Sequence, residues 1–287
     1  IPDNATSGGN KRGTYAVDLQ TARTNAAQVA SGSASVIIGG SGNTSSGLVS
    51  ISGGEGSVAN GYSAVALGYY VTAGNFSLSV GQSNTSNGSS IASGNFNNAN
   101  NGSAAIGNSN TATGTNSIAL GGSNAAPGAG SIAIGTSNST AYDFNYAVGN
   151  GNSLTSGPLG NNSFVFAFGL GNTVNAGYAT AIGCYGATDG VQGRQTFSSG
   201  RIAANGDAQK STFIYRGRTT DATLTTIATD GSNSINRSNL MQLPLNSTFR
   251  FKGTVIGRQS GSTNTAAWDV DGLLTKGTSH GTTTLVI

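Results

Sequence analysis

Large hydrophobic residues recur along much of this chain in a short phrase, in which two of them flank a small residue and a glycine follows. Clear examples are Ser117-Ile-Ala-Leu-Gly121 and Ser131-Ile-Ala-Ile-Gly135. The closing glycines lie at positions 39, 53, 68, 81, 94, 107, 121, 135 and 149, with successive spacings of 14, 15, 13, 13, 13, 14, 14 and 14 residues. A period this regular predicts a stack of similar coils.

Each coil divides into two short extended segments, the apolar phrase and a polar stretch rich in Ser, Asn and Thr. In a strand, residues i and i+2 share one side, so the large residues of the phrase and the small ones lie on opposite sides. We expect the large residues to fill the interior of the coil, with Ile118, Leu120, Ile132 and Ile134 as core. The small apolar residues Ala66, Ala119 and Ala133 occupy a side where a solvated strand favours charge. We therefore expect these alanines to pack against sister chains in a parallel homotrimer, because so narrow a core is too small to stabilise one chain.

The predicted fold class is all-β, with three regions. Residues 1–30 form an N-terminal segment that caps or attaches the roll, and residues 31–193 form a parallel β-roll of about 14-residue coils. From about residue 194 the period is lost, and segments such as 249–256 and 266–270 alternate polar and apolar residues. This alternation predicts an antiparallel, sandwich-like β domain over residues 194–287. The apolar end of the chain at 284–287 suggests that a further strand covers it.

The spacing breaks once, between Gly149 and Gly169, where Phe164-Val-Phe-Ala-Phe168 lies. One interpretation is a longer corner with larger core residues. The other is a side loop that exposes a binding surface.

Charge divides the chain in the same way. There is no Lys or Arg between Arg23 and Arg194, and only 8% of the residues are charged. After residue 193 there are ten Lys or Arg and five Asp, a net charge of +5. These cations are dispersed along strand-like segments, which favours a solvated face or contact with an acidic glycan over nucleic-acid binding.

Reactive side chains are few. The chain has one His (His280), one Cys (Cys184) and one Glu (Glu55), and it lacks a cluster of His and Cys that indicates a metal site. We expect no enzymatic activity and no cofactor or metal, with Cys184 as a small corner or core residue. The close carboxylate pair Asp269 and Asp271 follows Trp268, and together these three form the candidate glycan-binding site, with a core-edge Trp and an Asp-Gly turn as the alternative.

Residues 31–183 resemble the head repeats of YadA-like trimeric adhesins, through phrases of the Ser-Ile-Ala-Ile-Gly type. That resemblance implies a left-handed parallel β-roll that assembles as a trimer. The flanking segments, Arg12-Gly-Thr-Tyr-Ala-Val-Asp-Leu-Gln20 and Ala204-Asn-Gly-Asp-Ala-Gln-Lys-Ser211 with Thr219-Thr-Asp-Ala-Thr223, are similar to bacteriophage tail-fibre and tailspike proteins.

The function predicted on these grounds is that of a trimeric phage appendage, a tail fibre or tailspike, located on the virion. Its roll is a rigid shaft, its partners are other tail or baseplate proteins, and it binds host cell-surface polysaccharide or lipopolysaccharide. Recognition is expected at the 149–169 corner and in the basic region after residue 194. Membrane insertion is not expected, because no apolar run approaches roughly 20 residues. The alternatives are a bacterial YadA-like adhesin head, a capsid decoration trimer and a glycan-degrading tailspike.

Overall fold

The computed structural model contains only β-strands and connecting segments among the residues it describes. These are residues 10–155, 164–221, 223, 225–232, 236, 238–241, 243 and 246–278, together with the backbone of 283–286. Contacts divide the chain into two units, Ile1–Leu240 and Met241–Ile287. The division falls well after residue 194, where the C-terminal domain was expected to begin.

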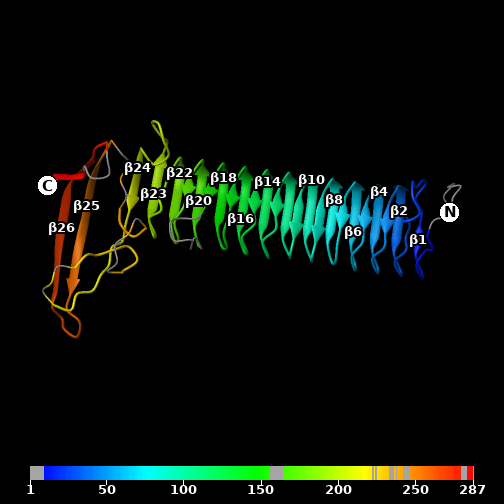
Figure 1. Cartoon of the computed structure of the whole chain (residues 1–287), viewed down its shortest axis with the longest axis horizontal. Helices are drawn as coiled ribbons and strands as arrows, with labels where there is room; N and C mark the ends of the chain where they lie inside the picture. The colour runs from blue at the N-terminus through cyan, green and yellow to red at the C-terminus, as the bar shows by residue number, and fades with distance from the viewer. Residues whose placement is uncertain are drawn as a thin grey trace. The chain divides into compact units, whose positions relative to one another are not determined.

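The first unit is a parallel β-solenoid, which confirms the predicted architecture. Its long sheet has fourteen strands, and Figure 1 shows them following one another along the solenoid in chain order. They are β1 (Val17–Asp18), β2 (Val36–Ser41), β4 (Ile51–Glu55), β6 (Val65–Tyr69), β8 (Leu78–Gln82), β10 (Ile91–Asn95), β12 (Ala104–Asn108), β14 (Ile118–Gly122), β16 (Ile132–Thr136), β18 (Tyr146–Asn150), β20 (Phe166–Leu170), β22 (Thr180–Cys184), β23 (Gln195–Ser199) and β24 (Gln209–Thr212). All neighbouring pairs are parallel except β23 and β24, which are antiparallel.

A second sheet of ten very short strands forms the other wall of the solenoid. Its strands are β3 (Thr44–Ser45), β5 (Val58–Ala59), β7 (Thr72–Ala73), β9 (Thr85–Asn87), β11 (Asn98–Asn100), β13 (Thr111–Ala112), β15 (Ala125–Ala126), β17 (Ser139–Thr140), β19 (Ser153–Leu154) and β21 (Thr173–Val174). Each coil therefore contributes one long and one short strand, and the strands pair in register from coil to coil. The parallel β-roll predicted from the period is present, and it extends over eleven long strands from β2 to β22.

The interior of the coil is filled by small residues, and the predicted assignment of the two strand sides is wrong. Ala66, Ala119 and Ala133 are completely buried inside their own chain, so they are not available to a sister chain. On the opposite side, Ile118, Leu120 and Ile132 are partly exposed and Ile134 is 37% exposed. The space between the two walls is filled mainly by alanine, serine and asparagine side chains, with an occasional aliphatic residue such as Ile37 or Leu154, and most of the large side chains of the long strands project outward.

A ladder of asparagine side chains runs through this interior. Asn124 shows the pattern: its Nδ2 donates to Asn110 Oδ1 at 3.1 Å and to the carbonyl oxygens of Leu120 and Gly135, both at 2.8 Å. Its Oδ1 accepts hydrogen bonds from the backbone N–H and the Nδ2 of Asn138, both at 3.0 Å. The same bonds link Asn84, Asn97, Asn110, Asn124, Asn138, Asn152 and Asn172. Because these buried amides are satisfied, a polar column is compatible with a dry core.

The closing glycines are required by both conformation and space. Gly121 has φ +114°, which lies in a region that side chains rarely adopt. A Cβ at this position would also overlap the carbonyl oxygen of Gly135 in the next coil. The neighbouring Gly122 has neither restriction, since its Cβ would meet Thr136 only at 3.8 Å.

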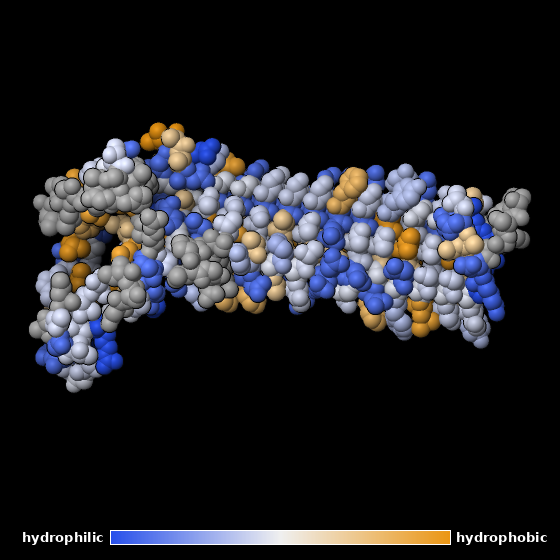
Figure 2. Space-filling model, in the orientation of Figure 1, coloured by the Kyte–Doolittle hydropathy of each residue, from blue (hydrophilic) through white to orange (hydrophobic). Residues whose placement is uncertain are grey.

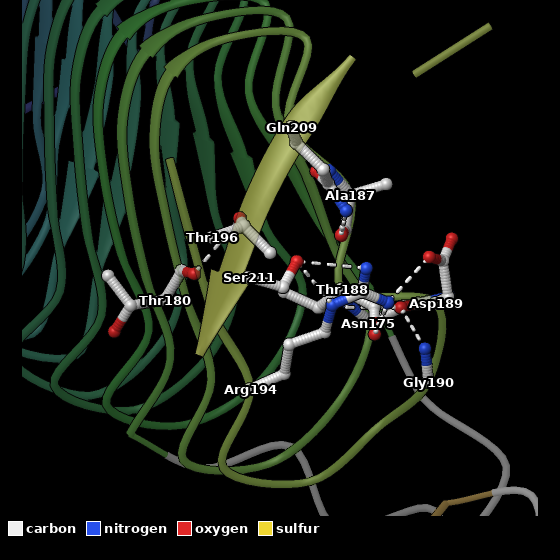
Figure 3. Close-up of polar contacts among 10 residues, drawn as sticks. All are labelled: Asn175, Thr180, Ala187, Thr188, Asp189, Gly190, Arg194, Thr196, Gln209 and Ser211. Atoms are coloured by element: carbon white, nitrogen blue, oxygen red, sulfur yellow. Dashed lines mark hydrogen bonds and ion pairs between the residues drawn. The ribbon is translucent and has the colours of Figure 1, made fainter. Parts of the chain in front are cut away.

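A buried polar cluster closes the C-terminal end of the solenoid (Figure 3). The side chain of Arg194 is 3% exposed and donates to Asp189 Oδ2 at 2.6 Å and to Ser211 Oγ at 3.0 Å. Its guanidinium also lies 5.2 Å from the ring centroid of Phe213. Burial lowers the pKa of Arg194, while the Asp189 carboxylate opposes that shift. The antiparallel strand β24 thus fixes Arg194 across the last coil.

At the other end, residues before β2 provide hydrogen-bonding groups to the first coil. Gln20 Oε1 accepts from the backbone N–H of Asn43 at 2.9 Å, and Gln20 Nε2 donates to the Gln28 carbonyl at 2.7 Å. Asp18 is buried and accepts from the backbone N–H groups of Gln20 and Ala30, both at 3.3 Å. These contacts satisfy polar groups where the stack begins.

The second unit is a single antiparallel sheet of β25 (Ser247–Arg258), β26 (Thr265–Lys276) and β27 (Thr283–Val286). Antiparallel structure was predicted correctly. In the described part of this unit, however, there is one sheet and not the two layers of a sandwich. The long, regular hairpin of β25 and β26 explains the alternation seen in the sequence, because alternating positions lie on opposite faces.

Candidate interaction surfaces

The outward face of the long sheet carries two parallel columns of large apolar side chains. The first column contains Val36, Ile51, Val65, Leu78, Ile91, Ala104, Ile118, Ile132, Tyr146 and Phe166, which are paired strand to strand. The second column contains Ile38, Leu67, Val80, Ile106, Leu120, Ile134, Val148, Phe168, Ile182 and Phe197, and it is interrupted by Gly53 and Ser93. Together we call them the apolar columns.

Many side chains of the apolar columns are exposed. Phe168 is 52% exposed, Phe197 is 61% exposed and Ile182 is 39% exposed. No charged residue occurs in either column. Because a monomeric protein rarely leaves so many large apolar side chains exposed along one face, the columns mark a candidate interaction surface. Figure 2 shows, on the face in view, apolar residues spaced along a mainly polar shaft.

Polar residues border the apolar columns. The strand pairing aligns Gly40 and Gly54, and not Gly39 and Gly53, with the later closing glycines. The position after the aligned glycine also faces outward, and it is occupied by Ser41, Glu55, Tyr69, Gln82, Asn95, Asn108, Gly122, Thr136 and Asn150. We call this row the polar margin. Its composition is that of a solvated surface, so the apolar surface ends between the second column and the margin.

The irregular corner between Gly149 and Gly169 leaves the sheet intact. Tyr146 pairs with Phe166 in the same register as in the regular coils. Phe166 and Phe168 belong to the apolar columns, whereas Leu154, Val165 and Val174 fill the interior. The prediction of larger core residues therefore holds for three aliphatic side chains and fails for the phenylalanines. The possible side loop, residues 156–163 with Pro158, lies outside the described residues.

Exposed aromatic rings gather at the corners of the coils. Phe144, Phe164 and Tyr178 form a continuous stack, with ring centroids 5.2 and 6.1 Å apart and interplanar angles of 5° and 8°. A Cβ on Gly130, one coil earlier, would lie 2.8 Å from the Phe144 ring. The Phe144 ring therefore covers the corner glycine of the preceding coil, while Phe144, Phe164 and Tyr178 remain 43%, 57% and 61% exposed.

The three candidate glycan-binding residues of the C-terminal unit do not form one site. Trp268 lies opposite Val255, on the apolar face of the β25–β26 hairpin, and is 56% exposed. Asp269 and Asp271 lie on the other face, as adjacent strand residues must. Asp271 Oδ2 pairs with Arg250 at 2.7 Å, which lowers the pKa of Asp271, and Asp269 accepts from the Thr254 hydroxyl at 2.8 Å. The proposed convergence of Trp268 with the two carboxylates is thus wrong.

The remaining reactive residues are scattered. Cys184 is a free thiol at the end of β22 and is partly exposed. His280 lies outside the described residues. Within the described residues, no group of three His, Cys, Asp or Glu side chains is placed to hold a metal ion. No helix of the described part is long and apolar enough to cross a membrane.

Comparison with protein families identifies the repeats. A family model for the YadA head domain repeat matches residues 52–84, 99–124 and 112–138. Over these residues the coils are similar to YadA head repeats. The matched segments lie within the coils from β4 to β16 and leave out residues 85–98, which include β10. Neither the curated proteins nor the solved structures that were searched gave a match.

Proposed function

We propose that this chain is a structural, adhesive protein that assembles as a parallel homotrimer through its apolar columns. The observation that carries the proposal is the charge-free double column of large side chains on the outward face of a solenoid whose own core is complete. The YadA head repeats support an adhesin-like role. In a parallel trimer, equivalent coils of the three chains lie at the same level. The apolar columns of the chains then cover one another along their whole length.

The trimer is an appendage, either a tail fibre or tailspike of a phage or the head of a bacterial YadA-like adhesin. The family match is compatible with both. The resemblance of residues 12–20, 204–211 and 219–223 to tail-fibre and tailspike proteins favours the virion, where other tail proteins hold the shaft. The host-side ligand in this proposal is cell-surface polysaccharide or lipopolysaccharide, and three equivalent sites on one rigid shaft give avidity without a tight single site.

Sedimentation velocity tests the assembly. The chain has a mass of 28.3 kDa, and we expect the purified protein to sediment at three times that mass. Ile134→Asp puts a carboxylate into the second apolar column and is expected to yield monomer or a much weaker trimer. Thr136→Asp, on the same strand and face but in the polar margin, is the matched control and should remain trimeric. A stable wild-type monomer at micromolar concentration would refute the proposal.

Location and catalysis have their own tests. Gold-labelled antibody against the chain should decorate tail tips in electron micrographs of virions. Labelling of bacterial cell surfaces without virions supports the bacterial head.

Incubation with host polysaccharide should leave the length distribution of the polysaccharide unchanged on size-exclusion chromatography. Shortened products would overturn the expectation that the protein is not an enzyme.

A further inference from the structure

We propose that three neighbouring residues of the polar margin, Glu55, Tyr69 and Gln82, form a sugar-binding site together with Tyr70. This inference rests on the proposed adhesive function, since it names the surface that contacts a host glycan. It also moves recognition from the C-terminal hairpin to the shaft, because the hairpin does not bring Trp268 and its neighbouring carboxylates together.

The backbone places the three side chains in one row. Glu55 pairs with Tyr69, and Tyr69 pairs with Gln82, on three consecutive parallel strands. Neighbouring strands lie about 4.8 Å apart, so the Tyr69 ring is flanked by a carboxylate on one side and a carboxamide on the other. The corner backbone stabilises the row, since Tyr70 N–H donates to the Glu55 carbonyl and Ser83 N–H to the Tyr69 carbonyl, both at 2.8 Å.

The two tyrosine rings are held in fixed orientations. Tyr69 and Tyr70 have ring centroids 4.6 Å apart and an interplanar angle of 89°. Tyr70 is at a corner with φ +51°, and a Cβ on Gly56 would lie 2.7 Å from its ring, so the ring covers that glycine. Tyr69 is nevertheless 46% exposed and Tyr70 is 56% exposed. An exposed, rigid pair of tyrosines offers a large apolar contact area together with two hydroxyl groups.

Glu55 has no structural partner that explains its presence. It is the only charged residue between Arg23 and Asp143. Within the described residues its exposed carboxylate takes part in no hydrogen bond or ion pair. Asp143, by contrast, accepts the backbone N–H of Ala129 at 2.7 Å and so has a local structural role. An unpaired charge beside two exposed aromatic rings, in a long uncharged shaft, is the feature that points to a ligand.

The chemistry of the row matches a pyranose ring. The C–H face of a sugar packs against an aromatic ring, while its hydroxyl groups need both acceptors and donors. Glu55 supplies two acceptor oxygens, and Gln82 supplies an acceptor and an NH₂ donor. The negative charge of Glu55, with no Lys or Arg between residues 24 and 193, disfavours uronic and sialic acids. The expected ligand is therefore a polysaccharide of neutral or amino sugars.

The other aromatic groups on the shaft lack this combination. The stack of Phe144, Phe164 and Tyr178 and the pair of Tyr62 and Phe76 are also exposed, but the only carboxylate that adjoins either group in sequence, Asp143, already accepts the Ala129 N–H. Tyr185 is covered by the guanidinium of Arg201, which lies 4.1 Å from its ring centroid. The polar margin also lies beside the apolar columns and not within them, and the proposal requires that it stays open when those columns are covered.

The test uses the full chain on a surface that carries immobilised lipopolysaccharides and capsular polysaccharides with neutral, amino-sugar and acidic repeats. We expect the wild type to bind a neutral or amino-sugar polysaccharide, and Tyr69→Ala to lower apparent affinity at least tenfold. Glu55→Gln should weaken that binding less, and should raise binding to acidic polysaccharides. Tyr178→Ser, which removes an equally exposed ring elsewhere on the shaft, is the control, and melting temperature and sedimentation confirm that each variant is folded and assembled.

Hydroxyl-radical footprinting of the wild type gives a readout that needs no variant. The bound polysaccharide should protect the peptide that contains Tyr69 and Tyr70 and leave the Tyr178 peptide unchanged. If the wild type binds but Tyr69→Ala binds equally well, or the footprint lies elsewhere, the site is refuted and the adhesive function stands. If the wild type binds none of the polysaccharides, the glycan ligand of the proposed function is refuted, and this site with it.

Discussion

The interior of the solenoid and the outward face of its long sheet are built from opposite kinds of side chain. The interior holds alanine, serine and a hydrogen-bonded asparagine ladder, with Ala119 and Ala133 completely buried. The outward face holds isoleucine, leucine and phenylalanine that the chain itself leaves exposed. In an ordinary domain the large apolar residues form the core.

The two kinds of side chain stabilise different things, the single coil and the assembly of chains. Hydrogen bonds and close backbone contacts define the shape of each coil, and they work within one chain. The large apolar residues contribute little inside one chain, and their burial becomes available only when other chains cover them. Stability of the coil and stability of the assembly therefore depend on different residues, which mutations can separate.

The largest effect is expected at the closing glycines. Gly121→Ala forces a side chain into φ +114° and into the carbonyl oxygen of Gly135, so we expect a loss of about 4 kcal/mol or more in the free energy of unfolding. Gly122→Ala, one residue later, has open space and should be neutral or slightly stabilising. Chemical denaturation of both variants measures the difference. Equal effects at the two positions would show that the glycine column is not sterically required.

The second largest effect on the free energy of unfolding is expected in the asparagine ladder. Asn124→Ala leaves the carbonyls of Leu120 and Gly135 and the backbone N–H of Asn138 without their partner, at a cost of about 3 kcal/mol in unfolding free energy. The exposed Asn150 lies outside the ladder, so Asn150→Ala should change stability by less than about 0.5 kcal/mol. Thermal melts of the two variants provide the comparison. A small effect at Asn124 would mean that water replaces the amide.

A third substitution tests which side of the strand faces inward. Ala133→Ile adds three carbons to a filled interior, and we expect it to cost about 2 kcal/mol through overpacking. Ile134→Ala removes volume from the outward face, so it should affect the coil weakly but lower the stability of the trimer. Denaturation curves at several protein concentrations separate the two effects, because only the second depends on concentration. If Ala133→Ile stabilised the protein, the assignment of the interior would be reversed.

The smallest effect concerns pH. The ladder contains no titratable group, so the interior should be insensitive to acid. At the exposed tip between β23 and β24, three backbone N–H groups, those of residues 202–204, donate to Asp207 and lower its pKa below the usual 3.8. A depressed pKa stabilises the tip above the ordinary value, and this stabilisation is lost as pH falls through the folded-state pKa.

Amide exchange measured by NMR between pH 5 and pH 2 tests this. After correction for intrinsic rates, protection of residues 202–204 should fall with acid, whereas amides along the asparagine ladder should keep theirs. Asp207→Asn is the control, because its tip should be insensitive to pH. Unchanged protection of the wild-type tip at pH 2 would contradict the assignment.

The row of Glu55, Tyr69 and Gln82 becomes visible only when the coils are aligned with one another. Glu55, Tyr69 and Gln82 are 14 and 13 residues apart, and they follow Gly54, Gly68 and Gly81. The strand pairing aligns Gly54, and not Gly53, with Gly68, and this alignment shows the row, whereas inspection of isolated residues led to Trp268 and its neighbours. Strand alternation alone already places Trp268 on the other face of the strand from Asp269 and Asp271, so the sequence by itself argues against a site that contains all three.

The sequence by itself was sufficient for the coils, their period, the parallel all-β architecture and the antiparallel C-terminal strands. These follow from local spacing, which repeats wherever glycine and the apolar phrase repeat. It was not sufficient for the direction in which Ile134 and Ala133 point. Alternation shows that the two sides of a strand differ, but when both are apolar it does not say which side is enclosed. That was decided by the packing of the two walls in the tertiary structure, which in the regular coils encloses alanine methyl groups and asparagine amides and leaves the isoleucines outside.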